Sequence, residues 1–154
     1  MKYDKSYLRN RFLLERRKKS FSFKKFNFDL LFSLIKKHFY NKKIIIAGYY
    51  PSDYEVDILN FLESASKKNF KVVLPVIKSS NLMTYRSWLF KEPLYINGYG
   101  IPEPEKSKQE FIPDLVMVPL VAYDSKLNRI GYGKGYYDRS LKKIRKVKKK
   151  SITL

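Results

Sequence analysis

Two short apolar segments separated by a helical pattern constrain the fold of this chain more than any other feature. Residues Ile44–Gly48 form a β-branched run that ends in glycine, and Lys71–Val76 contains a second apolar run of the same kind. Continuous apolar strands of this length are typical of sheets covered on both faces. Between them, apolar residues recur at helical spacing from Val56 to Asn69. The pattern therefore predicts a βαβ unit with two parallel, buried strands.

Further elements are predicted on either side of this unit. The predicted helices are Asp4–Ser20, Lys24–Phe39 and a stretch from Gly135 to about Val147. Short apolar runs predict strands at Met83–Trp88 and Leu115–Val118. The stretch Glu92–Pro113 is rich in proline, glycine and charge, so it is expected to form a loop over the ligand site. With 154 residues and neither a linker nor an internal repeat, the chain is expected to form one α/β domain.

A glycine-rich segment, NRIGYGKGYYD at residues 128–138, has the composition of a phosphate-binding loop. Its glycines are Gly131, Gly133 and Gly135. Glycine permits positive φ and close backbone approach, so successive N–H groups can converge on an anion where the next helix begins. Lys134 would add a full charge, and Asp138 could hold a magnesium ion that bridges phosphate oxygens. The segment is not a Walker loop, and Tyr136 replaces the third glycine of a dinucleotide fingerprint, so on spacing alone an ordinary loop is an equal alternative.

The absence of cysteine and the single histidine exclude several classes of site. Without cysteine there is no disulfide framework, thiolate zinc site or cysteine nucleophile, and His38 alone cannot form an imidazole-rich metal centre. The apolar stretches Ile44–Tyr50 and Leu115–Ala122 are far shorter than the ~18 residues of a membrane-spanning helix. The basic N-terminus is not followed by an apolar signal core. We therefore expect a cytoplasmic protein without a membrane partner, and we expect a monomer.

The net charge of +19 is compatible with a nucleic-acid partner, because a basic surface binds phosphates through counterion release. We do not favour this interpretation. The excess is mostly lysine spread along the chain, and the sequence contains no recognition helix, aromatic RNA-binding strand or zinc module. A small anionic substrate would be attracted by the same charge. A basic nucleic-acid-binding module is therefore the less favoured alternative.

Four segments, taken together, point to a known family. They are KSYLR at 5–9, YYPSDYEVD at 49–57, NGYGIPEP at 97–104 and VPLVAYDSKLNRIGYGKGYYDRSL at 118–141. In this order and spacing they resemble the 5-formyltetrahydrofolate cyclo-ligase family, also called methenyltetrahydrofolate synthetase. The resemblance implies one domain of this kind over residues 1–154, folded as a three-layer α/β/α sandwich with a mostly parallel central sheet. Because family members usually run some tens of residues further, it also implies that the domain is incomplete at its C-terminus and that the last strand or strands of the family fold are missing.

The resemblance further implies a reaction. The family uses ATP and Mg²⁺ to cyclise 5-formyltetrahydrofolate to 5,10-methenyltetrahydrofolate, with release of ADP and phosphate. Phosphoryl transfer of this kind needs positioning and charge neutralisation more than a protein nucleophile, which agrees with a chain that lacks cysteine. An alternative from another class is a shortened, non-catalytic remnant that binds ATP or folate weakly or not at all.

The resemblance assigns residues to a nucleotide site. Lys5 and Arg9 stand four apart on one helix face; as a bare charge pair they would simply be solvated, whereas the family's corresponding pair contacts the nucleotide. Arg129 would be a further phosphate cation with bidentate geometry, or else an exposed turn residue. The other nucleotide-binding residues are Gly131, Tyr132, Gly133, Lys134, Gly135, Tyr136 and Tyr137. Lys134, Tyr136 and Arg129 are implied in catalysis, and Asp138 is expected to hold the metal.

A second set of residues is assigned to the folate. It comprises Tyr50, Glu55, Trp88 and Tyr136. In isolation Glu55 would be an acid at a helix start, whereas in the family pattern it binds folate, and a buried carboxylate can accept hydrogen bonds from pterin N–H groups. Trp88, like Met83, would belong to the core on residue type alone, although flat heteroaromatic ligands favour aromatic contacts. Asp124 is expected to form a turn rather than to bind a ligand.

Overall fold

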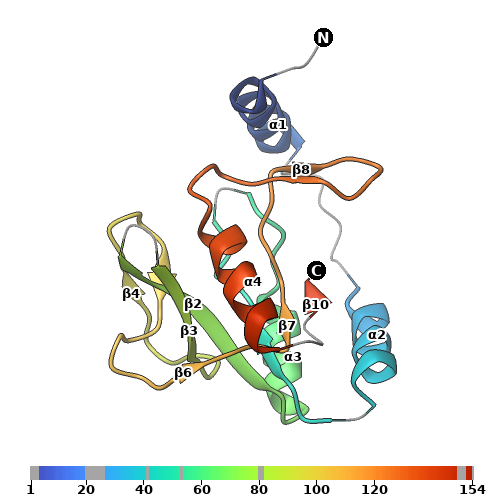
Figure 1. Cartoon of the computed structure of the whole chain (residues 1–154), viewed down its shortest axis with the longest axis vertical. Helices are drawn as coiled ribbons and strands as arrows, with labels where there is room; N and C mark the ends of the chain where they lie inside the picture. The colour runs from blue at the N-terminus through green and yellow to red at the C-terminus, as the bar shows by residue number, and fades with distance from the viewer. Residues whose placement is uncertain are drawn as a thin grey trace.

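The computed structural model describes residues 4–19, 27–40, 42–52, 54–79, 82–148 and 152–153 (Figure 1). The helices are α1 (Lys5–Lys19), α2 (Asp29–Phe39), α3 (Leu59–Lys67) and α4 (Tyr136–Val147). The longer strands are β1 (Ile45–Ala47), β2 (Lys71–Ser79) and β3 (Leu82–Ser87). The two-residue strands are β4 (Tyr95–Ile96), β5 (Pro102–Glu103), β6 (Glu110–Phe111), β7 (Leu115–Val116), β8 (Ala122–Tyr123), β9 (Arg129–Ile130) and β10 (Ile152–Thr153). No helix in the described parts of the chain is long and apolar enough to cross a membrane.

A six-stranded sheet forms the centre of the molecule. Its strand order is β10-β7-β1-β2-β3-β6. The first four strands of this order run parallel, whereas β3 is antiparallel to both β2 and β6. Ile46 of β1 pairs with Val72 of β2 and with Leu115 of β7. The sheet is therefore mostly parallel, and the predicted βαβ unit is confirmed as β1, α3 and β2.

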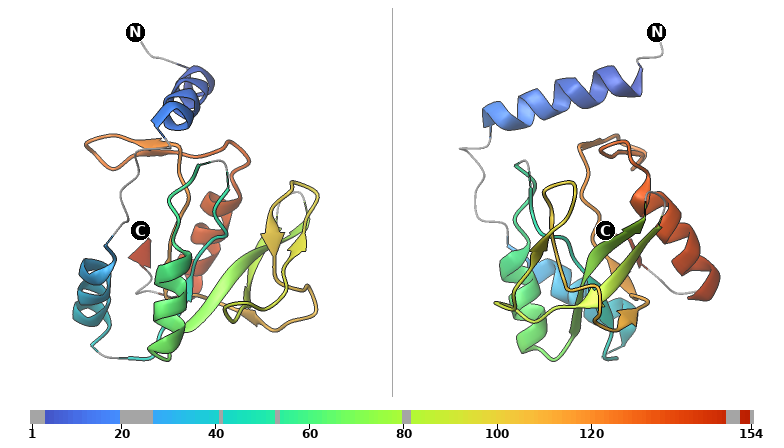
Figure 2. Two further views of the ribbon diagram at one scale, coloured as in Figure 1. Left: turned by 180° about the vertical axis from the view of Figure 1, so that it is seen from behind. Right: turned by 90° about the vertical axis from the view of Figure 1, so that its left-hand side faces the viewer.

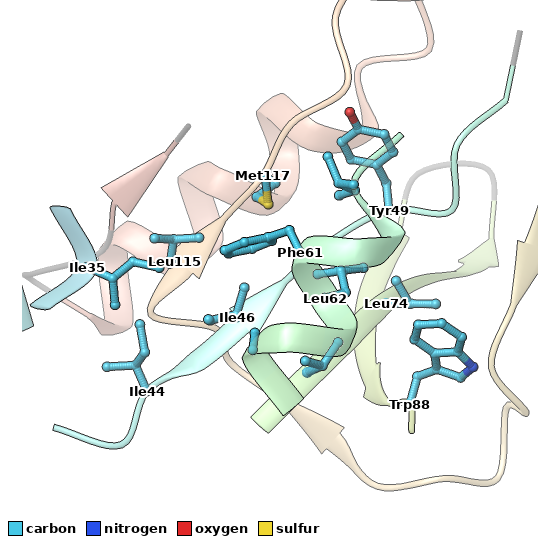
Figure 3. Packing of buried hydrophobic residues seen from close by; sticks show 13 residues of the cluster. Ile35, Ile44, Ile46, Tyr49, Phe61, Leu62, Leu74, Trp88, Leu115 and Met117 are labelled. Atoms are coloured by element: carbon cyan, nitrogen blue, oxygen red, sulfur yellow. The ribbon is translucent and has the colours of Figure 1, made fainter. Parts of the chain in front are cut away.

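Alternation along the buried strands separates two apolar faces. Ile46, Leu74 and Leu115 pack in one cluster with side chains of α2 and α3, such as Phe61 (Figure 3). The intervening residues of the same strands point to the opposite face and pack against α4. Those residues are Ala47, Val73 and Val116. Period-2 alternation in strands covered on both sides produces this arrangement, so the expected three-layer α/β/α sandwich is confirmed.

Helix boundaries agree with the predictions except at both ends of α3, which stops at Lys67, and at the start of α2, which begins at Asp29 after the non-helical Asn27 and Phe28. Helix α3 begins at Leu59, three residues later than predicted, because the Asp57 carboxylate accepts a hydrogen bond from the Leu59 N–H at 2.9 Å and forms a turn there. The predicted helix from Gly135 is confirmed as α4, and α1 matches its prediction to within a residue. Residues 24–26, where the second helix was predicted to begin, and Ser20 lie outside the described part of the chain.

Short strands occupy regions that were predicted as loops. Within 92–113, β4 and β5 form a hairpin and β6 pairs with the edge of β3. A second hairpin, β8–β9, was not predicted. Its turn is closed by Asp124, whose carboxylate accepts hydrogen bonds from the N–H groups of Lys126 at 2.9 Å and Asn128 at 2.8 Å. The expectation that Asp124 forms a turn is thereby confirmed.

Helix α1 lies outside the three layers, next to the β8–β9 hairpin (Figure 2). None of its residues is buried. Hydrogen bonds from two arginines, Arg9 and Arg16, join it to residues 120–132. These polar contacts bring the basic face of α1 to the glycine-rich segment.

Candidate functional site

One cavity of about 550 Å³ collects nearly all the residues that the sequence singled out. The segments that follow β1 and β7 form part of its wall, which is where ligands bind in parallel α/β sheets. The sequence-predicted residues that line it are Lys5, Arg9, Tyr50, Glu55, Arg129, Gly131, Tyr132, Gly133, Lys134, Gly135, Tyr136, Tyr137 and Asp138. They come from α1, the loop after β1, strand β9, the glycine-rich segment and the start of α4. Residues separated by more than a hundred positions therefore share one surface.

The glycine-rich segment enters α4 through two residues with positive φ. Gly133 has φ +97° and Gly135, which immediately precedes α4, has φ +70°. L-residues with a side chain adopt this conformation only at a cost, so glycine is favoured at both positions. Because α4 starts at Tyr136 on the cavity wall, its unpaired N–H groups and the positive end of its dipole lie beside the cavity. Such a terminus favours an anion.

Helix α1 contributes cations to the same wall. The Arg9 Nε donates to the Gly131 carbonyl at 2.8 Å, and Lys5, one turn earlier, also lines the cavity. Two turns further along the same face, Arg16 Nη1 donates to the Tyr132 hydroxyl at 3.1 Å. Sequence reasoning missed Arg16. The signal was present, since spacings of four and seven residues from Lys5 through Arg9 to Arg16 place all three on one stripe of a helix.

Arg129 and Asp138 form an ion pair at the cavity rim, with side chains 28% and 76% exposed. The described residues contain no cluster of three or more acidic, histidine or cysteine side chains that could hold a metal without help from a ligand. Magnesium is commonly bound by one or two carboxylates together with substrate phosphates and water. Asp138 fits that role if the magnesium ion replaces Arg129 as the partner of its carboxylate. Both roles, metal ligand and phosphate cation, stay predictions.

Glu55 lies in the loop between β1 and α3, four residues before the helix, so it is not an acid of the first turn. Its Oε2 accepts a hydrogen bond from the Ser52 N–H at 2.8 Å. Burial raises the pKa of this carboxyl, while hydrogen bonds from Ser52 and Tyr132 and the charge of Arg16 act in the opposite direction. Burial and the Glu55 charge also raise the pKa of the neighbouring Tyr49 and Tyr132 hydroxyls. A half-buried acceptor of this kind suits a ligand that presents N–H donors.

The β4–β5 hairpin closes the side of the cavity that faces α4. The Tyr99 and Tyr136 hydroxyls are 3.1 Å apart, and their rings meet edge-on with centroids 6.2 Å apart. The Lys134 ammonium lies 5.6 Å from the centre of the Tyr99 ring. At the base of the hairpin the Glu103 carboxylate, 3% exposed, accepts from the Asn97 amide at 3.1 Å. The NGYGIPEP segment had signalled this region, but sequence reasoning gave no role to its residues.

Trp88 does not lie with the other predicted residues, and the expectation for it is corrected. Its side chain is 5% exposed and belongs to the core cluster on the α3 side of the sheet, beside Leu74 (Figure 3). The indole N–H donates to the Glu92 carbonyl at 3.2 Å, and the ring meets Phe90 edge-on. Because Trp88 follows β3 on the face opposite α4, its side chain packs into the apolar layer rather than the cavity.

Comparison with known proteins adds independent information. The model of the 5-formyltetrahydrofolate cyclo-ligase family matches residues 1–154. The chain is 35% identical over 102 residues to a 5-formyltetrahydrofolate cyclo-ligase of Haemophilus influenzae, covering 62% of this chain and 54% of that protein. It is 37% identical over 95 residues to a probable 5-formyltetrahydrofolate cyclo-ligase of Schizosaccharomyces pombe, covering 58% and 47%. The chain thus spans about half the length of the curated relatives it matches.

Two solved structures have a similar fold. A 5,10-methenyltetrahydrofolate synthetase from Aquifex aeolicus superimposes with a TM-score of 0.65 at 27% identity, over 90% of this chain and 72% of that one. The corresponding protein from Mycoplasma pneumoniae gives a TM-score of 0.59 at 22% identity, over 91% and 78%. At these identities the superpositions support the sandwich fold described above.

Proposed function

The chain belongs to the 5-formyltetrahydrofolate cyclo-ligase family, and on that premise we propose that it uses ATP to cyclise 5-formyltetrahydrofolate to 5,10-methenyltetrahydrofolate. The observation that carries the proposal is the single cavity in which the glycine-rich segment, the basic face of α1 and the Glu55 carboxylate meet. The first two suit the phosphates of a nucleotide, and the third suits the N–H groups of a pterin. Two ligands would therefore lie side by side in one cavity.

The proposed chemistry is a phosphoryl transfer followed by ring closure. The formyl oxygen attacks the γ-phosphorus of ATP, and the bond from that phosphorus to ADP breaks. N10 of the folate then attacks the activated formyl carbon, the carbon–oxygen bond breaks with release of inorganic phosphate, and N10 loses its proton. A formamide oxygen is a poor leaving group, so its conversion to a phosphate makes the second step feasible. No side-chain nucleophile is required.

Each group on the cavity wall has a role in this scheme. The backbone N–H groups around Gly133 and the ammonium of Lys134 would neutralise charge on the transferred phosphoryl group. Arg9 and Arg129 would orient the remaining phosphate oxygens through their planar guanidinium groups. The Tyr136 hydroxyl lies between the glycine-rich segment and the hairpin, within reach of both ligands. Positioning the two reactants in this way supplies much of the rate enhancement of such a transfer.

Magnesium would be held by Asp138 together with phosphate oxygens of ATP, where it would reduce the negative charge on the transferred group. The protein's own part is to present one carboxylate at the rim and to release it from Arg129. We also propose that the protein acts in the cytoplasm as a monomer on small-molecule substrates, without a specific nucleic-acid partner. A log–log plot of affinity for duplex or single-stranded DNA against salt tests the last point, since a nucleic-acid module would give a steep slope.

Isothermal titration with Mg·ATP and with 5-formyltetrahydrofolate, beside a turnover assay that follows methenyl product by absorbance, tests the proposal. We expect saturable binding of both ligands and product formation that requires ATP. A Lys134→Ala variant should lose turnover, whereas Lys18→Ala, an exposed lysine of α1, should retain it. Binding of both ligands without turnover would favour the non-catalytic alternative. Failure of the wild-type protein to bind either ligand would overturn the assignment of the cavity.

A further inference from the structure

Arg16 makes three hydrogen bonds to other segments of the chain, one of them to Tyr132 on the cavity wall, and a solvated helix residue would make none of these. One nitrogen of its guanidinium, Nη1, donates to the Tyr132 hydroxyl at 3.1 Å. The other, Nη2, donates to the carbonyls of Leu120 and Val121, the latter at 2.8 Å. The side chain is therefore held by three acceptors from two segments. These are the connection between β7 and β8 and the glycine-rich segment. A planar guanidinium can satisfy such a set, but a lysine ammonium cannot match its geometry.

Tyr132 lies between Arg16 and Glu55. Its hydroxyl accepts a hydrogen bond from Arg16 Nη1 at 3.1 Å, and Tyr132 and Glu55 both line the cavity. In this position a hydrogen bond from the Tyr132 side chain lowers the pKa of the Glu55 carboxyl, against the effect of burial. The N–H and the hydroxyl of Ser52 also donate hydrogen bonds to this carboxylate. The hydroxyls of Tyr49 and Tyr137 interact with it electrostatically. Among the described groups, Arg16 supplies the positive charge that lowers the pKa of Glu55 and so favours the ionised form of this half-buried carboxyl.

We propose that Arg16 is a positioning residue for the folate half of the cavity: through Tyr132 it orients the Glu55 carboxylate. This inference rests on the proposed function, since the ligand of Glu55 is the folate named there. It separates α1 into two functional parts. Lys5 and Arg9 serve the phosphate end of the cavity, and Arg16, two turns later on the same face, serves the pterin end.

The alternative is that Arg16 only fastens α1 to the body of the protein. In that case its loss would loosen the whole helix and would weaken both ligands together, because Lys5 and Arg9 are carried on the same helix. A positioning role predicts instead that the folate is affected and ATP is not. The two alternatives therefore differ in a measurable selectivity.

The test uses Arg16→Gln, Tyr132→Phe and their combination, with Lys18→Gln as a matched charge-removal control on an exposed position of α1. The first readout needs no ligand: a pH titration of the Glu55 side-chain carbon by ¹³C NMR, assigned with Glu55→Gln. We expect a higher Glu55 pKa in Arg16→Gln and in Tyr132→Phe and an unchanged one in Lys18→Gln. If Arg16 acts through Tyr132, the double variant should show less than the sum of the two single effects.

The second readout is calorimetric affinity for each ligand. We expect Arg16→Gln and Tyr132→Phe to weaken 5-formyltetrahydrofolate by at least ~10-fold, since hydrogen bonds that involve a charged group are the stronger ones, with less than ~3-fold change for Mg·ATP. Tyr132→Phe removes a single oxygen, so it keeps the test valid if Arg16→Gln disturbs α1. A wild-type Glu55 pKa in both variants, or equal weakening of both ligands, would overturn the positioning role. If the two substitutions alter the Glu55 titration but the wild-type protein does not bind 5-formyltetrahydrofolate, the proposed function is overturned instead.

Discussion

Arg9 lies directly over Gly133: its guanidinium carbon would be 3.3 Å from a Cβ placed on that glycine. The same side chain donates from Nε to the Gly131 carbonyl at 2.8 Å. The close approach exists because Gly133 has no side chain and adopts φ +97°, a conformation that L-residues avoid. A side chain at position 133 would force the Arg9 guanidinium to shift, and this close contact joins α1 to the phosphate end of the cavity.

Replacing Gly133 by alanine should therefore affect both stability and ATP binding. We expect a loss of about 1–2 kcal/mol in the free energy of unfolding from backbone strain, and a larger loss in ATP affinity as Arg9 is displaced. Gly98→Ala is the matched control, since a Cβ there meets no atom within 4 Å, its φ is not positive and Gly98 does not line the cavity. Chemical denaturation and calorimetry measure the two effects. Equal behaviour of the two alanine variants would contradict the account.

The ion pair between Arg129 and Asp138 should contribute little to stability, because the Asp138 side chain is 76% exposed. We expect Asp138→Asn to change the free energy of unfolding by less than ~1 kcal/mol. Its effect should fall on magnesium: ATP affinity in the variant should no longer rise when Mg²⁺ is added. Glu15→Gln, which breaks an exposed pair with Arg11 on α1, is the control and should leave the magnesium response intact. A full magnesium response in Asp138→Asn would remove Asp138 as the metal ligand.

Trp88 should be important for stability and irrelevant to folate. It is 5% exposed, and its indole N–H donates to the Glu92 carbonyl at 3.2 Å. Trp88→Phe would lose that hydrogen bond and leave a partly filled space, so we expect a destabilisation of about 1–3 kcal/mol with unchanged affinity for 5-formyltetrahydrofolate. Urea denaturation and calorimetry on the same preparation measure both quantities. If Trp88→Phe binds folate more weakly without any loss of stability, Trp88 belongs to the ligand site.

The buried Tyr85 should contribute to the loss of stability in alkali. Burial raises the pKa of its hydroxyl from 10.0 to about 12, against a hydrogen bond from Ser140. The folded protein thus keeps a proton that the unfolded chain loses, so this contribution is complete below pH 10 and is lost as the pH rises through 12. Tyr85→Phe should be less stable than wild type at neutral pH by about 1 kcal/mol, for want of the Ser140 bond. At high pH the difference in free energy of unfolding between Tyr85→Phe and wild type should change by on the order of 2–3 kcal/mol in favour of the variant. A pH-independent difference would contradict this assignment.

The sequence predicted the central elements because their patterns are local. The apolar runs of β1 and β2, the helical spacing of α3 between them and the glycine before α4 each determine structure within a few residues. The same is not true of the β8–β9 and β4–β5 hairpins. Their strands are two residues long, and pairing such as Tyr123 with Arg129 is decided by turn chemistry and tertiary contacts rather than by periodicity.

The candidate site shows the same division. Residues close together in the glycine-rich segment could be proposed from their spacing, and the family resemblance added Lys5, Arg9 and Glu55, all of which line the cavity. Arg16 was missed, although its spacing places it on the helix face of Lys5 and Arg9, because its hydrogen-bond acceptors lie more than a hundred positions away in the sequence. Trp88 was misplaced because an aromatic residue after a strand can face either layer of the sheet, and only the packing of the strand decides which.

The central claim is that the glycine-rich segment binds the phosphates of ATP. Amide NMR of ¹⁵N-glycine-labelled protein tests this claim most directly. The chain has six glycines, so the spectrum contains one signal for each. On addition of Mg·ATP we predict shifts at Gly131, Gly133 and Gly135, while Gly48, packed against Leu62 in the core, stays in place. Saturation with Mg·ATP that leaves those three loop signals unmoved would contradict the account.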